Sequence, residues 1–374
     1  MGVLQVDSFR LKRRSRWGVK RPATITAVMG DLCRSKLWSI RWIEPAWSDD
    51  NKLSSETCET GKTDDGCPIN AMLGTFSLPR SPVMPADTAD TATNLSPDRL
   101  QTLLEVATEA ALAGGAVLKQ YWGKLDRANQ IESKGRLGDL VTVADKEAEA
   151  AVLDVLRRHV PDHAILAEES GASGIDGSDF LWAIDPLDGT TNYAHQYPFS
   201  ATSVGLLVNG VPTIGAIYDP FHDELFRAAQ GLGATRNRQP IQVSPCDRLA
   251  DSLLVTGFAY DRRETLDTNY AEFCHLTHCT QGVRRGGAAS LDLAYVACGR
   301  LDGYWERGLS PWDIAAGIII VQEAGGCVTA YDQSPLVVKT GRLLVTNGRI
   351  HEELSATLLA IEPLPQFDPQ NLTS

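Results

Sequence analysis

The sequence predicts an α/β fold in which helices and sheets are stacked in layers. From about residue 96 onward, apolar stretches of strand length alternate with amphipathic stretches of helix length. Several of these stretches begin or end at an acidic residue, which is where α/β folds gather their ligand groups. Because alternating strands and helices bury their apolar faces by packing as layers, we expect an α/β sandwich.

The first predicted element is a helix that follows Ser96-Pro97. Serine suits the position before a helix, and proline suits its first turn. Apolar residues then recur with helical spacing up to Tyr121-Trp122, at Leu100, Leu103, Leu104, Ala107, Ala111 and Leu118. A second helix is predicted from about Lys146 to His159.

Short apolar runs predict the strands. The run from Phe180 to Ile184 is interpreted as a buried strand that stops at Asp185-Pro186, because proline ends ladder pairing. The remaining runs predict strands at 164–167, 201–208, 212–218 and 254–258, and helices at 291–298 and 314–323.

The first 95 residues have a different composition and are predicted to be a poorly ordered extension. Basic residues crowd the stretch from Arg10 to Arg21, three tryptophans follow, and 79–95 has the Pro, Ala, Thr and Asp content of a linker. Three interpretations stay open: an organelle-targeting peptide, a nucleic-acid or partner-binding arm, and a stretch without a folded role, which we favour. Residues 96–365 are predicted to form the folded domain and 366–374 a C-terminal tail.

Composition and charge narrow the class of function. A chain of 374 residues with 43% hydrophobic residues can bury a sizeable core. The net charge of −12 argues against nucleic-acid binding by the folded body. No apolar run approaches the ~18 residues that span a bilayer. The eight cysteines show no disulfide spacing, which favours a cytoplasmic protein, or one of the plastid stroma if the extension is a transit peptide.

The most informative stretch runs from Trp182 to Tyr193. Asp185 and Asp188 lie three residues apart after the predicted strand, and Gly189 and Thr190 follow where a helix could begin. Hard divalent cations prefer carboxylate and phosphate oxygens, while N–H groups at a helix start bind phosphate. The stretch therefore predicts a metal-dependent phosphate site, although Asp-Pro and Asp-Gly are also ordinary turn dipeptides.

Other acids stand at similar positions. Asp145 precedes the second helix, Glu168-Glu169 follows the strand at 164–167, and Asp313 opens the helix at 314–323. Taken singly, Asp145 and Asp313 could be helix caps and Glu168 a solvated strand end. Their shared position at the ends of apolar elements favours a common site.

These motifs resemble the inositol monophosphatase family of Mg²⁺-dependent, lithium-sensitive sugar phosphatases. The resemblance covers about residues 97–362, through Trp182–Tyr193, Trp312–Gly317, Asp139–Asp145 and Glu168-Glu169, in that family's order. It implies a layered αβαβα sandwich, a homodimer and a small phosphomonoester as substrate.

The resemblance also implies the metal ligands. Glu168, Asp185 and the Leu187 carbonyl would hold one Mg²⁺, and Asp185, Asp188 and Asp313 a second. Two such ions polarise the phosphoryl oxygens and activate a water, so that no covalent intermediate is needed. Thr190 would bind this water, Asp145 would orient the Thr190 hydroxyl, and Glu168 would assist deprotonation.

Substrate contacts are implied in the same way. The N–H groups of Gly189 and Thr190 would receive the phosphate. The remaining contacts would come from Gly287, Ala289, Glu306 and Asp313, with Lys134 at the wall of the site. Glu306 can accept two hydrogen bonds from a polyol, which favours myo-inositol monophosphate. Ala288 departs from relatives that carry threonine there.

Alternative functions are the same chemistry on another sugar phosphate, histidinol phosphate or an adenosine phosphate, and an added regulatory role through RNA or transcription complexes. Only the basic stretch before residue 96 supports the last. Cys274, His275, His278 and Cys279 superficially suggest zinc, but their spacing is closer than that of structural zinc modules, and helix packing is the better interpretation.

Overall fold

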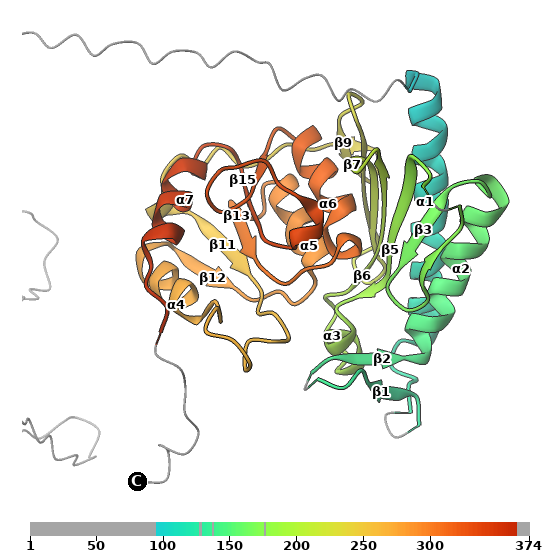
Figure 1. Cartoon of the computed structure of the whole chain (residues 1–374), viewed down its shortest axis with the longest axis horizontal. Coiled ribbons are helices and arrows are strands. Elements are labelled where there is room, and N and C mark those ends of the chain that lie inside the picture. Colours follow the sequence, from blue (N-terminus) through green and yellow to red (C-terminus); the bar gives the residue numbers. More distant parts are fainter. Residues whose placement is uncertain (1–94, 127–128, 137, 176, 365–374) are drawn as a thin grey trace, which may run out of the picture. The chain divides into compact units, whose positions relative to one another are not determined.

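The computed structural model describes residues 95–126, 129–136, 138–175 and 177–364, all within the second of two compact units, Pro82–Ser374. Residues 1–94 and the predicted tail at 366–374 lie outside the described residues, so the domain boundaries stay a prediction. The described part is built from five layers in the order helices, sheet, helices, sheet, helices (Figure 1). The predicted αβαβα sandwich is confirmed.

The larger sheet has eight strands in the order β10-β9-β8-β7-β6-β5-β3-β4. Its neighbours run antiparallel except for the parallel pair β3 and β5. Helices α1 (Pro97–Tyr121) and α2 (Val143–His159) cover its outer face (Figure 1). The strands are β3 (Ala164–Ala167), β4 (Gly171–Ser173), β5 (Phe180–Asp188), β6 (Ala201–Val208), β7 (Val211–Asp219), β8 (Glu224–Ala229), β9 (Ala234–Arg236) and β10 (Gln239–Pro240).

The smaller sheet has five strands in the order β12-β11-β13-β15-β14. Helices α5 (Ala289–Ala297) and α6 (Pro311–Glu323) lie between the two sheets, and α4 (Tyr270–Cys279) and α7 (His351–Ala360) form the far layer (Figure 1). The strands are β11 (Leu253–Thr256), β12 (Gly282–Arg284), β13 (Gly303–Glu306), β14 (Cys327–Thr329) and β15 (Leu343–Thr346).

Smaller elements complete the described chain. A hairpin of β1 (Ile131–Ser133) and β2 (Leu140–Thr142) precedes α2, and α3 (Thr190–Ala194) follows β5. Two short 3₁₀ turns complete the smaller-sheet region: η1 (Leu249–Asp251) precedes β11, and η2 (Val338–Thr340) lies between β14 and β15. The hairpin and α3 matter because both lie beside the end of β5 that carries the acids (Figure 1).

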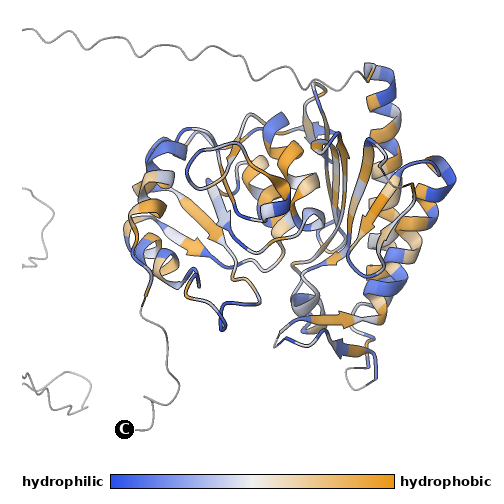
Figure 2. Ribbon diagram, in the orientation of Figure 1, coloured by the Kyte–Doolittle hydropathy of each residue, from blue (hydrophilic) through white to orange (hydrophobic). Residues whose placement is uncertain are grey.

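Separate apolar clusters hold the layers together. One lies between α1, α2 and the larger sheet, another between the two sheets around α5 and α6, and a third between the smaller sheet and the outer helices. Hydrophobic residues are concentrated in the strands and in α5 and α6, whereas α1 and α2 turn polar residues outward (Figure 2). Burial of apolar surface in these clusters fixes the strand ends that carry the acids.

The expected end of the central strand at Asp185-Pro186 is wrong. Strand β5 continues to Asp188, with Asp185 opposite Ser203 and Asp188 opposite Ala201. The register shifts between these two pairs, so an irregularity accommodates Pro186, which has no N–H to donate. The consequence is that Asp185 and Asp188 are both held by the sheet itself.

The starts of three helices were predicted two or three residues too late. Helix α2 begins at Val143 because Thr142 and Asp145 form a capping box, and α6 begins at Pro311 with the same arrangement of Ser310 and Asp313. Helix α5 begins at Ala289. Within the described residues, no helix combines the length and apolar character needed to cross a bilayer.

Candidate active site

Four of the acids predicted from the sequence come from three elements and meet in one place. Glu168 follows β3, Asp185 and Asp188 lie in β5, and Asp313 lies in the first turn of α6. Burial raises the pKa of Asp185 well above its ordinary value, and the charges of Glu168, Asp188 and Asp313 raise it further. The Glu168 N–H donates to the Ile184 carbonyl at 3.1 Å, and Ser203, which pairs with Asp185, donates to the Trp312 carbonyl at 3.3 Å. These contacts bring the segments that carry the four acids together, and we refer to the four side chains as the acidic cluster.

Asp185 lies at the centre of this cluster and is 2% exposed. Its Oδ1 accepts a hydrogen bond from the Leu187 N–H at 3.0 Å, and the backbone N–H of Glu168 donates to the carbonyl of the preceding residue, Ile184, at 3.1 Å.

Asp188 is held by the start of α5. Its oxygens accept hydrogen bonds from the Ala289 N–H at 3.2 Å, from the Ser290 N–H at 2.7 Å and from the Ser290 hydroxyl. Burial raises the pKa of Asp188 to about 6, although the bonds from Ser290 act to lower it. A carboxylate at a helix N-terminus is favourably placed for its negative charge.

Asp145 links the start of α2 to the turn after β5. Its Oδ2 accepts from the Thr142 N–H at 2.8 Å and from the Thr142 hydroxyl at 2.6 Å, as in a capping box. Its Oδ1 accepts from the Thr190 hydroxyl at 3.0 Å. Burial raises the pKa of Asp145 to about 7. The helix-capping interpretation is thus correct for one oxygen, while the other orients Thr190.

Lys134 extends from the β1–β2 hairpin to the same acids. Its Nζ lies 2.8 Å from Glu168 Oε1 and 2.6 Å from Glu169 Oε1, and all three side chains are at least three-quarters buried. Burial disfavours the charged lysine, but the charges of Glu168 and Glu169 outweigh this effect and raise the Lys134 pKa. The lysine is the cation that the protein itself supplies to this end of the cluster.

Asp313 lies at the start of α6, where its Oδ2 accepts a hydrogen bond from the Ser310 N–H at 2.6 Å. Burial, followed by the charge of Asp188, raises the Asp313 pKa well above its ordinary value. The helix-cap interpretation is therefore correct for Asp313 as well, and it is compatible with a place in the acidic cluster.

The donor set fits a hard divalent cation. Every candidate ligand is an oxygen, the carboxyls are buried, and their mutual repulsion is what such an ion would relieve. Within the described ranges, however, no three His, Cys, Asp or Glu side chains are already grouped as a ready-made metal site. Protein donors engage Asp188, Asp313 and Glu168 instead, so the individual metal ligands stay predictions.

Gly189 allows the chain to turn from β5 into α3. Its φ of 89° lies in the left-handed region, where a side chain would be strained. An added Cβ would also lie 2.9 Å from the Phe199 carbonyl oxygen and 3.2 Å from the Ala288 Cβ. The turn therefore requires glycine, and it brings Gly189 and Thr190 beside the loop that precedes α5.

Three of the predicted substrate-binding residues, Gly287, Ala289 and Glu306, lie at the start of α5 and the end of β13. Glu306 is 8% exposed, and its Oε2 accepts a hydrogen bond from the Tyr304 hydroxyl at 2.6 Å. Burial raises the pKa of Glu306 to about 7. Gly287 and Ala289 flank the start of α5, whose N–H groups bind Asp188. The start of α5 thus contacts a predicted metal ligand, Asp188, and carries predicted substrate-binding residues.

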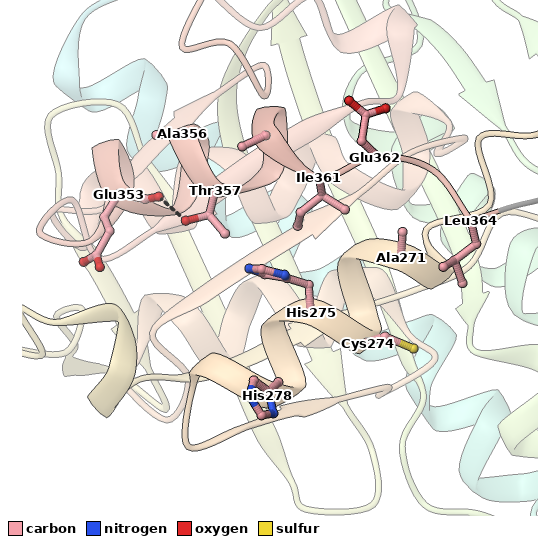
Figure 3. Close-up of a pocket in the computed structure, with 11 residues that line it drawn as sticks. Ala271, Cys274, His275, His278, Glu353, Ala356, Thr357, Ile361, Glu362 and Leu364 are labelled. Carbon is pink, nitrogen blue, oxygen red and sulfur yellow. Dashed lines mark hydrogen bonds between the residues drawn. The ribbon is translucent and has the colours of Figure 1, made fainter. Parts of the chain in front are cut away.

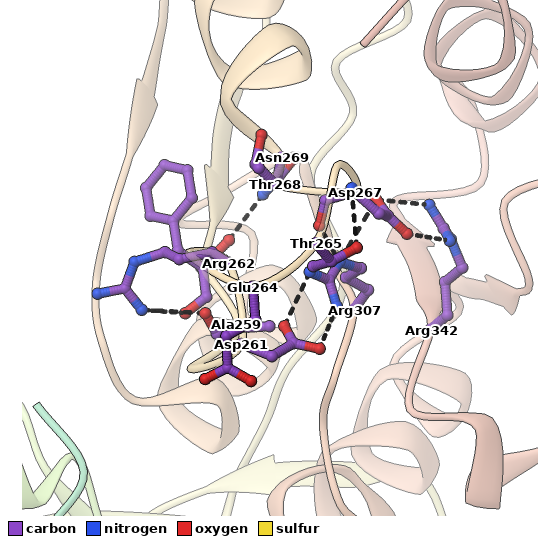
Figure 4. Close-up of polar contacts among 12 residues, drawn as sticks. Ala259, Asp261, Arg262, Glu264, Thr265, Asp267, Thr268, Asn269, Arg307 and Arg342 are labelled. Atoms are coloured by element: carbon purple, nitrogen blue, oxygen red, sulfur yellow. Dashed lines mark hydrogen bonds and ion pairs between the residues drawn. The ribbon is translucent and has the colours of Figure 1, made fainter. Parts of the chain in front are cut away.

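Sequence reasoning missed Ser290 and Tyr260. Ser290 binds Asp188 across 102 positions of sequence, a pairing for which the sequence carries no local signal. Tyr260 is partly exposed, yet crowding around it and the charges of Asp139, Glu168 and Asp313 raise its pKa. Tyr260 belongs to the loop 257–269, whose acids pair with Arg307 and Arg342 (Figure 4).

A separate cavity of about 830 Å³ lies between α4 and α7, and none of the predicted site residues lines it (Figure 3). His275 and His278 project toward it from α4 (Figure 3). Together with Cys274 and Cys279 they share one helix, and within the described chain they form no metal-binding group.

Comparisons with known proteins agree with this geometry. The model of the inositol monophosphatase family matches residues 99–362. An inositol-1-monophosphatase of Synechocystis sp. is 64% identical over 265 residues, which are 71% of this chain and 91% of that protein. The solved inositol monophosphatase from Anabaena (Nostoc) sp. has 64% identity and a TM-score of 0.65, covering 71% of this chain and 98% of its own.

A further relative is named for a different role. The Nus factor SuhB of Pasteurella multocida is 39% identical over 256 residues, 68% of this chain and 95% of that protein. Proteins of this family are generally metal-dependent, in agreement with the donor set described above. From the matched family, the shared fold and the converging acids, the chain belongs to the inositol monophosphatase family and is a phosphoric monoester hydrolase.

Proposed function

We propose that the protein hydrolyses myo-inositol monophosphate to inositol and phosphate with Mg²⁺ as cofactor. One observation carries the proposal: the carboxyls of the acidic cluster are buried together. Among the described residues, Lys134 is the one basic side chain that pairs with them, through Glu168. A hard divalent cation can supply the missing positive charge and bind the phosphate oxygens of the substrate at the same time.

The metal ligands in this proposal are Glu168, Asp185 and the Leu187 carbonyl for one ion, and Asp185, Asp188 and Asp313 for a second. When bound, Mg²⁺ supplies charge for the phosphoryl oxygens and lowers the pKa of the attacking water. The hydrogen bonds from Ser290 and Ala289 hold Asp188, and the bond from Ser310 holds Asp313, so both carboxyls are oriented before any ion arrives.

The protein's own groups position the water. The Thr190 hydroxyl can donate its single proton either to Asp145 Oδ1 at 3.0 Å or to the Leu187 carbonyl at 3.1 Å. Its oxygen is then left to accept a hydrogen bond from the attacking water, and Glu168 takes the proton that the water loses. The Gly189 and Thr190 N–H groups receive the phosphate oxygens.

Recognition of the alcohol rests on the other side of the cluster. The Glu306 carboxyl has one oxygen bound by Tyr304, which leaves the second for a substrate hydroxyl. Gly287 and Ala289 present backbone groups beside it, and Asp313 borders both metal and substrate. Lys134 forms the opposite wall through its contacts with Glu168 and Glu169. A small polyol with several hydroxyls matches this set.

The experiment that tests the proposal is a panel of phosphate esters assayed with added Mg²⁺, with a chelator, and with Mg²⁺ plus Li⁺. We expect kcat/KM to be highest for myo-inositol monophosphate, activity to disappear with the chelator, and Li⁺ to inhibit. A preference for fructose 1,6-bisphosphate, histidinol phosphate or an adenosine phosphate would keep the reaction and replace the substrate.

A second candidate role is regulatory and is favoured by the similarity to the Nus factor SuhB. It would add binding of RNA or a transcription complex to the phosphatase activity. The basic stretch Arg10–Arg21, which would supply phosphate contacts, lies outside the described residues. RNA retention by the full chain, compared with a chain that begins at residue 96, distinguishes the roles, because binding through the stretch is lost on truncation and weakens with salt.

For assembly and location, we propose a homodimer in the cytoplasm, with the plastid stroma as the alternative. The family resemblance supports the dimer, and the cysteine content supports a reducing compartment. Analytical ultracentrifugation of the purified chain and cell fractionation would test these two points separately.

A further inference from the structure

The carboxyl of Asp292 is buried without a hydrogen-bond partner. The residue is 1% exposed, and among the described residues its Oδ1 and Oδ2 are the only buried side-chain polar atoms that lack a partner. Protein interiors seldom leave such a group unpaired, because burial removes its water without replacement. We therefore expect the Asp292 carboxyl to gain a hydrogen-bond partner when a ligand is bound.

Asp292 is not needed to cap its helix. Asp188 already accepts the hydrogen bonds of the first N–H groups of α5, at Ala289 and Ser290. Asp292 lies in the same first turn of α5, and its carboxyl lies against the residues that precede the helix. A Cβ added to Gly286 would lie only 2.1 Å from Asp292 Oδ1, so the carboxyl packs directly against that turn.

The nearest backbone donor just fails to bind the carboxyl. The Gly287 N–H acts to lower the Asp292 pKa, but the two groups do not form a hydrogen bond of ordinary geometry. Gly287 has a φ of 92°, in the left-handed region that glycine tolerates. The peptide that carries its N–H is held on its other side by Asn192, whose Nδ2 donates to the Gly286 carbonyl at 3.1 Å. A rotation of this peptide that moves the N–H onto Asp292 would complete the bond and would shift the Asn192 contact.

The same turn faces the proposed polyol site. Gly287 and Ala289 are predicted substrate contacts, and Glu306 lies near enough for its charge to raise the Asp292 pKa after burial has done so. We propose that Asp292 is a positioning residue, whose carboxyl completes a hydrogen bond with the Gly287 N–H when a polyol phosphate occupies the site. This inference rests on the proposed polyol substrate and assigns a residue that fixes its binding turn.

The proposal predicts an unusual combination of effects for Asp292→Ala in the full chain. The substitution removes both unpaired oxygens without adding volume, so the Tm of the metal-free protein should stay equal or rise. KM for myo-inositol monophosphate should rise about three- to tenfold, which is the worth of one hydrogen bond, while kcat changes less than about twofold. Asp292→Asn keeps an acceptor and should recover most of the wild-type KM.

A matched control comes from Asp302, another buried aspartate. Its Oδ1 accepts a hydrogen bond from the Ser244 hydroxyl, and its Oδ2 accepts from the Leu253 N–H at 2.6 Å. Asp302→Ala should lower the Tm, because it strands these donors. p-Nitrophenyl phosphate, which has no ring hydroxyls, should show a smaller rise in KM with Asp292→Ala than the polyol ester does.

Each outcome has a distinct meaning. A lower Tm for Asp292→Ala that matches Asp302→Ala, with KM unchanged, would show a structural role and overturn the proposal. Equal rises in KM for both esters would overturn it as well. If the wild-type protein does not prefer the polyol ester to p-nitrophenyl phosphate, the proposed substrate is wrong and the Asp292 role falls with it.

Discussion

Two acid-rich regions of the molecule differ in whether their carboxyls have basic partners. In the loop 257–269, Asp261 lies 2.9 Å from Arg307, and Asp267 lies 2.7 Å from Arg342 (Figure 4). The hydrogen bond from Arg307 lowers the Asp261 pKa. In the acidic cluster, burial raises the pKa of Asp188 to about 6, and the described residues offer Lys134 alone as an ion-pair partner, at the Glu168 end.

This difference separates structural acids from acids kept for a ligand. A carboxylate paired with arginine contributes to folding as it stands. Buried carboxyls that repel one another are a cost to folding until a cation arrives. The arginine pairs brace the loop, whereas the acidic cluster has the buried, mutually repelling carboxyls that the proposed Mg²⁺ site requires.

The substitution expected to separate the two regions most strongly is Asp188→Asn. It removes one ligand charge and keeps the side-chain volume and one acceptor oxygen, while the amide NH₂ cannot accept the N–H bond that this position receives from α5. The protein should therefore fold with a small loss of stability and lose more than about 100-fold in kcat/KM at ordinary Mg²⁺. Asp261→Asn, in the paired loop, is the matched control and should retain Mg²⁺-dependent turnover. Wild-type activity in the cluster variant would refute the metal assignment.

Thr190→Val removes the hydroxyl that bridges Asp145 and the attacking water, with little change in volume. We expect kcat to fall roughly 10- to 100-fold while KM changes little, because the water is no longer oriented. Steady-state kinetics with myo-inositol monophosphate would check this. A change confined to KM would instead assign Thr190 to substrate binding.

The pH dependence of stability should distinguish the regions without any assay of activity. The folded-state pKa values of Asp188 and Asp145 are raised to about 6 and about 7, above those of an unfolded chain. Such groups stabilise the fold below the unfolded value, and this contribution is lost as the pH rises through 6 and 7. The metal-free protein should therefore melt roughly 5–10 °C higher near pH 5 than near pH 8.

Calorimetric scans with and without Mg²⁺ would measure this effect. Added Mg²⁺ should raise the Tm more at pH 8, where the carboxyls are ionised, than at pH 5. A Mg²⁺ effect that is the same at both pH values would mean that these acids do not bind the ion.

Arg307→Met should affect the brace alone. It breaks the pair with Asp261 and leaves the Asp267 carbonyl without its guanidinium donor, so the free energy of unfolding should fall by about 1–2 kcal/mol. Urea denaturation would give the size of this loss. The affinity for Mg²⁺ should not change, and a joint loss of stability and Mg²⁺ affinity would show that the regions are not separate.

The smallest expected effect lies outside both regions, in the turn between β9 and β10. Asn237 and Arg238 both have positive φ values, 49° and 66°, which a two-residue hairpin requires and which arginine adopts with strain. Arg238→Gly should raise the free energy of unfolding by about 0.5–1 kcal/mol, with activity unchanged. Urea denaturation of Arg238→Gly and Arg307→Met in parallel would compare the two changes in the free energy of unfolding.

Much of the site could be predicted because its residues lie at the ends of regular elements. Glu168 at a strand end and Asp313 at a helix start carry local signals, and both lie in the cluster as expected. Asp145 caps α2 with one oxygen and accepts a hydrogen bond from Thr190 with the other, so the capping interpretation is compatible with its predicted catalytic role, which stays a prediction.

The rest depends on contacts between distant parts of the chain. The passage of β5 through Pro186 requires the irregular pairing with β6, which no local rule predicts. Ser290, Tyr260 and Asp292 become notable only when α5 and the loop 257–269 are folded against β5. Their roles follow from neighbours rather than from their own sequence surroundings.

The central claim is that the buried acids form a binding site for Mg²⁺, and calorimetric titration of Mg²⁺ into the metal-free protein tests it most directly. We predict saturable binding to the wild-type chain, at least about tenfold weaker binding to Asp188→Asn, and no change for Asp261→Asn. Equal affinity in all three proteins, or ester hydrolysis that persists undiminished in a chelator, would contradict the account.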